Sequence, residues 1–175
     1  MKLIGLAGWS GAGKTTLLTR VIPVLRARGL RVSTIKHAHH KFDVDTPGKD
    51  SFAHREAGAT EVLVSSGRRF ALMHELRDEP EWALRNLLRK ITPVDLVIVE
   101  GFKADAHPKI EVHRLENGKP FLHPQDSAIV AVATDARLAA GIPVFGLDDI
   151  AAIADMMLAR AVAVDEILGS DDVGA

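Results

Sequence analysis

Apolar residues follow two different spacings along this chain, and the spacing separates strands from helices. Short, nearly continuous apolar runs are typical of strands buried in a sheet. They occupy residues 2–7, 30–36, 94–99, 128–134 and 144–147. Apolar residues three or four positions apart predict helices at residues 14–28, 50–57 and 81–91, and a last one from Asp148 or Asp149 to about residue 161. This alternation predicts an α/β fold with a largely parallel, twisted sheet flanked by helices.

Two further patterns predict antiparallel hairpins added to that sheet. Residues 60–65 and 69–76 resemble two strands on either side of Ser66-Gly67. Residues 110–115 and 121–122 flank Glu116-Asn117-Gly118-Lys119, in which Asn-Gly is a strong hairpin signal. No linker or internal repeat divides the chain, so we expect one domain over residues 1–163 and a frayed tail over residues 164–175.

The first strand and the first helix are joined by a complete phosphate-binding motif. The motif G-x-x-x-x-G-K-[ST] is matched by residues 8–15, and the predicted binding set is Gly8, Trp9, Ser10, Gly11, Ala12, Gly13, Lys14, Thr15 and Thr16. The glycines allow the backbone N–H groups to surround a phosphate, and the ammonium of Lys14 reaches the β- and γ-phosphates. The hydroxyl of Thr15 is a ligand for the Mg²⁺ that bridges them. The motif and its flanks predict a nucleoside triphosphate site in a P-loop NTPase fold.

A second Mg²⁺ ligand is sought at the carboxyl ends of the parallel strands, where ligands gather in such sheets. The strand over residues 94–99 has Asp95 at its start and Glu100 at its end, about 16 Å apart at 3.3 Å per residue. Glu100 is therefore the candidate, acting on the metal directly or through water, and Lys14 and Glu100 are the candidate catalytic groups. The alternative for Glu100 is a carboxylate bonded to nearby backbone N–H groups.

The polar loop over residues 37–48 lies where a switch segment would contact the γ-phosphate. Asp45 and Asp43 are the candidates for a further aspartate ligand of Mg²⁺, because Asp50 is equally explained as a helix N-terminal residue. Of the two, Asp45 is the predicted ligand. The cluster formed by His37, His39 and His40 either binds a transition metal or is a solvated polar loop, and Lys36 and Lys41 are candidates to attract anionic groups.

Asp135 follows the strand over residues 128–134 at the same predicted edge. A carboxylate there can accept two N–H groups of guanine, an arrangement that adenine does not offer. The lysine that usually precedes such an aspartate by two residues is replaced by Ala133. The alternative is that Asp135 caps a short helix over residues 136–140.

The composition mainly excludes certain partners, membrane spans and kinds of site. The 175 residues have a formal net charge of −1 and 5% aromatic residues, which gives no reason to expect nucleic acid as a partner. No apolar run approaches the roughly 20 residues of a membrane span, and no signal-peptide pattern is present. The absence of cysteine excludes disulfides and thiolate metal sites and fits a reducing compartment, so we expect a cytoplasmic protein.

Five segments of the chain match the pattern of one known family. They are Gly8–Thr16, Lys36-His37-Ala38-His39-His40, residues 45–51, Arg55-Glu56-Ala57-Gly58-Ala59 and Val99-Glu100-Gly101-Phe102-Lys103. Together they resemble the MobB family of GTP-binding adapter proteins. The resemblance covers roughly residues 1–160. It implies GTP and Mg²⁺ as ligands, molybdopterin as a further ligand, weak GTPase activity, and a homodimer. It also implies a partner, a MobA-type guanylyltransferase that attaches GMP to molybdopterin.

Two other functions are compatible with a phosphate loop. A small-molecule kinase would need an arginine-rich lid, and Arg68-Arg69 is the one tight arginine pair in the chain. A metal-delivery GTPase would use the histidines at residues 37–40, and the absence of cysteine argues against it.

Overall fold

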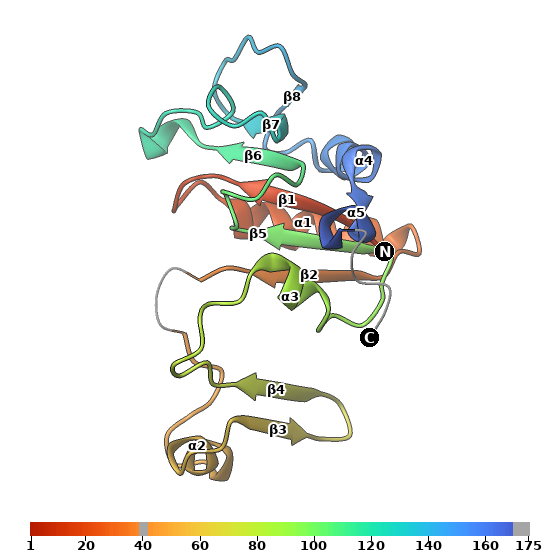
Figure 1. Cartoon of the computed structure of the whole chain (residues 1–175). Helices are drawn as coiled ribbons and strands as arrows, with labels where there is room; N and C mark the ends of the chain where they lie inside the picture. Colours follow the sequence, from red (N-terminus) through yellow and green to blue (C-terminus); the bar gives the residue numbers. More distant parts are fainter. Residues whose placement is uncertain (39–41, 170–175) are drawn as a thin grey trace. The chain divides into compact units, whose positions relative to one another are not determined.

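The computed structural model describes residues 1–38 and 42–169 and divides into two compact units (Figure 1). The large unit comprises residues 1–37 and 84–175, and the small unit comprises residues 38–83. One domain over residues 1–163 is expected from the sequence, and this remains a prediction. Residues 38–83 are inserted between two elements of the large unit.

The large unit contains the predicted parallel sheet. Its main strands lie in the order β2-β5-β1-β6-β7-β8 and pair in parallel throughout. Their bounds are β1 (Lys2–Ala7), β2 (Val32–Lys36), β5 (Leu96–Glu100), β6 (Lys109–His113), β7 (Ile129–Thr134) and β8 (Val144–Phe145). A short strand, β9 (Val162–Ala163), pairs antiparallel with the start of β1. The α/β fold class predicted from the sequence is confirmed.

Helices cover both faces of this sheet. On one face, α1 (Lys14–Ala27) and α4 (Ile150–Arg160) bury residues such as Leu25 and Met157 against the strands. On the other face, α3 (Leu84–Leu88) and α5 (Val164–Leu168) pack over Leu3 and Val97. Two interior strands of this sheet, β1 and β5, are buried on both faces, as continuous apolar runs predict.

Two helix predictions need correction. The helix expected over residues 81–91 extends only from 84 to 88, and Trp82 lies before its start. The Trp82 ring lies 4.7 Å from the ring of His74 in the small unit. Residues 164–168, expected within a frayed tail, form α5, which buries Val164.

The second predicted hairpin is wrong. Both edges of β6 are occupied by parallel neighbours, β1 and β7, so no antiparallel strand can pair with it. Asn-Gly instead ends a single 3₁₀ turn, η1 (Leu115–Asn117), with Gly118 in the left-handed region at φ 60°. The backbone N–H groups of Leu122 and His123 donate to the buried carboxylate of Glu111. Residues 136–140 are not helical either.

The small unit consists of α2 (Asp50–Glu56), β3 (Glu61–Ser65) and β4 (Phe70–His74). The first predicted hairpin is confirmed, since β3 and β4 pair antiparallel from Glu61↔His74 to Ser65↔Phe70. It is a separate two-stranded sheet, however, and is not added to the large one. Its apolar pair Val62 and Met73 is buried, which gives the unit a small core of its own.

Candidate functional site

The loop between β1 and α1 has the backbone that its glycines predict. Gly8, Gly11 and Gly13 have φ values of 146°, 80° and 92°, a region that L-residues with a Cβ rarely adopt. A Cβ on Gly8 would also collide with the carbonyl oxygen of Val112 on β6. The glycines are therefore required by the fold of the loop itself, and Gly13 stands at the N-cap of α1.

Lys14 is half-buried and folds back over this loop. Its Nζ donates to the carbonyl oxygens of Gly8 and Trp9, each at 3.0 Å. Burial lowers the pKa of the Lys14 ammonium, the Glu100 carboxylate opposes this shift, and the charges of Lys103 and Lys36 add to it. The ammonium therefore lies beside the loop, near two further positively charged side chains, and this positive charge favours the binding of an anion.

Glu100 lies at the carboxyl end of β5, in register with Leu6 of β1 and Lys36 of β2. Its side chain is 13% exposed, and its Oε1 is 3.8 Å from the Nζ of Lys36. Asp95 lies before the start of the same strand and accepts the backbone N–H of Arg31 at 2.7 Å, which lowers the pKa of the Asp95 carboxyl. The two acids are at opposite ends of β5, as the strand rule predicts.

A pocket of about 420 Å³ adjoins the loop on the side of β7 and β8. It is lined by Gly13, Thr16, Leu17, Arg20, Arg114, Thr134, Asp135, Gly146, Leu147 and Asp148. Asp135 is exposed there, and its Oδ1 accepts the backbone N–H of Leu115 at 2.7 Å. Arg20 and Asp148 form an ion pair at 2.6 Å in the same lining. The phosphate loop and Asp135, predicted separately, therefore border one cavity.

Asp45 belongs to the small unit, where its carboxylate already has partners. Its Oδ1 accepts from the Ser51 hydroxyl and from the Thr46 N–H, both at 2.9 Å, and its Oδ2 lies 3.4 Å from Nε of Arg55. Arg55 also bonds Asp43. Among the described residues Oδ2 has no hydrogen-bond partner, and the role of Asp45 toward Mg²⁺ remains a prediction.

Of the histidine cluster, His37 is described and stacks on Phe102 with 4.7 Å between ring centroids. His39, His40 and Lys41 lie outside the described residues. Among residues 1–38 and 42–169, no group of three or more His, Asp or Glu side chains is placed to hold a metal ion.

The sequence analysis missed the segment that follows β6. Arg114 Nη2 lies 3.3 Å from the position that a Cβ on Gly13 would occupy, and the Asn117 side-chain amide donates to the Ser10 carbonyl oxygen at 2.9 Å. The indole N–H of Trp9 donates to the carbonyl of Pro120 at 2.8 Å. The segment was interpreted as a hairpin turn. The rule used for Glu100 could have identified this segment, because Arg114 follows a strand of the same sheet.

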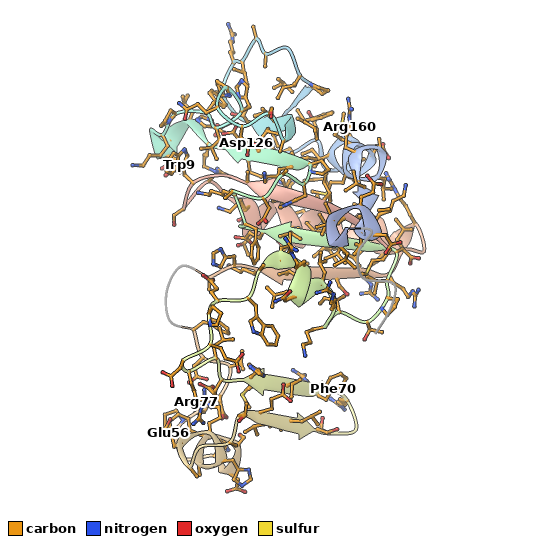
Figure 2. All side chains as sticks on the ribbon, in the orientation of Figure 1. Trp9, Glu56, Phe70, Arg77, Asp126 and Arg160 are labelled. Carbon is orange, nitrogen blue, oxygen red and sulfur yellow. The ribbon has the colours of Figure 1, made fainter. Side chains whose placement is uncertain are left out.

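Figure 2 shows Trp9 at the end toward which β6 points and Arg160 at the opposite end.

Comparisons with known proteins agree on one family. The model of MobB, described as molybdopterin guanine dinucleotide synthesis protein B, matches residues 3–135. The molybdopterin-guanine dinucleotide biosynthesis adapter proteins of Escherichia coli K12 and Haemophilus influenzae are each 43% identical, over 89% of this chain and 91% and 86% of theirs. A crystal structure of molybdopterin-guanine biosynthesis protein B superposes with a TM-score of 0.69 at 30% identity, covering 90% of this chain and 98% of that one. No helix within the described residues could cross a membrane.

Proposed function

Because this chain belongs to the MobB family, we propose that it is a GTP-binding adapter in the synthesis of molybdopterin-guanine dinucleotide. The observation that carries the proposal is the juxtaposition of a complete phosphate loop with a pocket bordered by Asp135. A nucleotide whose phosphates are bound by residues 8–16 would extend its base into that pocket. The pathway in this proposal, molybdopterin-guanine dinucleotide biosynthesis, is the one that the names of the relatives above state.

The triphosphate is bound mainly by the loop amides and by Lys14. Thr15 and Glu100 would hold Mg²⁺, since hydroxyl and carboxylate oxygens are the ligands that this ion prefers. When bound, the ion neutralises charge on the phosphates. The small exposure of Glu100, 13%, and its place at the strand end beside the loop fit this donor set. Asp45 remains a predicted further ligand of the ion.

Asp135 is the proposed contact for guanine. One of its carboxylate oxygens is bonded to the Leu115 N–H. The carboxylate as a whole can accept more than one further donor, because each oxygen carries two lone-pair sites. Ala133 leaves the site without the usual second side chain, so the preference for guanine over adenine rests on Asp135 and the pocket walls.

We further propose a homodimer formed by the hairpin of the small unit. Leu63, Phe70 and Leu72 share one face of β3–β4 and are 61%, 70% and 46% exposed. A two-stranded sheet with such a face is marginal alone, and a second copy of this chain would cover it. The mass of the purified chain in light scattering should be twice 18.9 kDa, and a Leu72→Glu variant should be a monomer. A monomeric wild type would contradict this proposal.

The direct test of function is reconstitution. A MobA-type guanylyltransferase is incubated with GTP, Mg²⁺ and molybdopterin, with and without this protein, and transfer of GMP is measured. A cytoplasmic adapter with slow hydrolysis should bind the enzyme and raise the yield. Preference for ATP with rapid turnover would favour a kinase. Stoichiometric nickel or zinc uptake that a His39/His40 double alanine variant loses would favour metal delivery.

A further inference from the structure

Arg114 lies near the phosphate loop, and no described side chain forms an ion pair with its guanidinium. Its Nη2 lies 3.3 Å and its Nε 3.6 Å from the position that a Cβ on Gly13 would occupy. Within residues 1–38 and 42–169 its guanidinium has no hydrogen-bond or ion-pair partner. The other arginine in the pocket lining, Arg20, is paired with Asp148 at 2.6 Å. Arg114 is therefore the arginine of this pocket whose donors remain available to an anion.

The segment that carries Arg114 is fastened to the phosphate loop. The Asn117 amide donates to the Ser10 carbonyl oxygen at 2.9 Å, and the Trp9 indole donates to the Pro120 carbonyl at 2.8 Å. A third bond, from the Leu115 N–H to Asp135, connects the segment to the end of β7 at 2.7 Å. The backbone that carries Arg114 is consequently held beside the loop, so little backbone ordering entropy would be lost when its side chain binds a ligand.

The order of the strands places Arg114 along the bound nucleotide. Glu100 is the last residue of β5, on one side of the loop after β1. Arg114 follows β6, on the other side, and Asp135 follows β7, the next strand. A nucleotide with its metal-bound phosphates toward Glu100 and its base toward Asp135 would therefore present its α-phosphate to Arg114.

We propose that Arg114 binds the α-phosphate of the guanine nucleotide, as a contact shared by the mono-, di- and triphosphate. The inference rests on the nucleotide site proposed above. An arginine fork offers paired N–H donors that match phosphate oxygens, and a charge-assisted bond of this kind contributes more than a neutral one. An arginine acting on the γ-phosphate during hydrolysis would instead distinguish GTP from GDP.

Calorimetric titration of the full chain with GTP, GDP, GMP and guanosine tests this assignment. We expect Arg114→Ala to weaken the binding of GTP, GDP and GMP by a similar factor of roughly tenfold or more. The affinity for guanosine should hardly change. Arg114→Lys should recover part of the loss. Arg160→Ala, which removes an exposed arginine from the end of α4, is the matched control and should bind like wild type.

The outcomes separate this inference from the function on which it rests. If the wild type binds none of the phosphorylated nucleotides, the nucleotide site itself is wrong. If the wild type binds them and Arg114→Ala binds them equally well, the assignment of Arg114 is wrong. A loss confined to GTP would also overturn it, because that pattern belongs to a γ-phosphate contact. Thermal denaturation of each variant shows whether it is folded.

Discussion

Lys14 is the single side chain on which phosphate binding depends most. Its ammonium bonds two loop carbonyls, which fixes it where the β- and γ-phosphates would lie. We expect Lys14→Ala to weaken GTP binding by up to about 100-fold while the melting temperature changes little, since one charged contact contributes up to about 3 kcal/mol. Lys2→Ala, at the other end of β1, is the control. Equal affinity in the two variants would place the site elsewhere.

Glu100 and Asp95 offer a paired test, because both are acids at the ends of one strand. Glu100→Ala should reduce the gain in GTP affinity that Mg²⁺ provides. Asp95→Ala should leave that gain unchanged, since its carboxylate bonds the Arg31 backbone instead. Titrations with and without Mg²⁺ measure the difference. Identical losses in both variants would contradict the assignment of the metal to the strand end.

Gly5 shows how closely β1 is packed at the side of β6. A Cβ there would lie 2.5 Å from Nε2 of His107 and 2.8 Å from Cγ of Lys109, both buried. We expect Gly5→Ala to lower the free energy of unfolding by about 1–3 kcal/mol, the usual cost of overpacking. Gly141→Ala meets no atom within 4 Å and is the control in the same unit. Denaturant titration gives both values; equal stability would show that His107 can move aside.

At the scale of elements, the hairpin of the small unit is expected to respond to pH through His74. Its ring bonds Glu61 at 2.8 Å and Glu79 at 3.4 Å, and the Glu61 bond chiefly raises the pKa of His74. A raised pKa means that the protonated ring stabilises the fold fully below the unfolded value of about 6.5 and that this stability is lost as pH rises through the folded value.

The His74→Asn variant removes that titration. Its stability should therefore depend less on pH than wild type in the window that begins near pH 6.5 and extends above it. Thermal melts across this window compare the two proteins, and NMR follows the ring of His74 directly. A folded His74 that titrates below 6.5 would contradict the role of the two glutamates.

Elements with strong local signals could be predicted from the sequence, and those decided by tertiary contacts could not. The apolar run of β5 and the Ser66-Gly67 turn each admit one local structure, and both were predicted. Asn117-Gly118 admits two, a hairpin turn or the end of a 3₁₀ turn, and the occupied edges of β6 decide between them. Trp82 lies outside its predicted helix, and its ring packs on that of His74, eight residues earlier in the chain.

The same distinction applies to the candidate site at the scale of the whole molecule. Residues 8–16 carry a motif whose spacing defines their backbone, so the loop was predicted residue by residue. Glu100 followed from a rule about sheet edges. Arg114 carries no motif; the same rule covers the end of β6, but the proximity of Arg114 to Gly13 exists only once β6 lies beside β1. The partners of Asp45, among them Arg55, were equally invisible as a sequence pattern.

Calorimetric titration of the purified chain with GTP and with ATP, in the presence of Mg²⁺, tests the central claim most directly. The account predicts one GTP bound per chain, weaker ATP, and loss of the GTP signal in Lys14→Ala. Absence of heat with either nucleotide at millimolar concentration, or an undiminished GTP signal in Lys14→Ala, would contradict it.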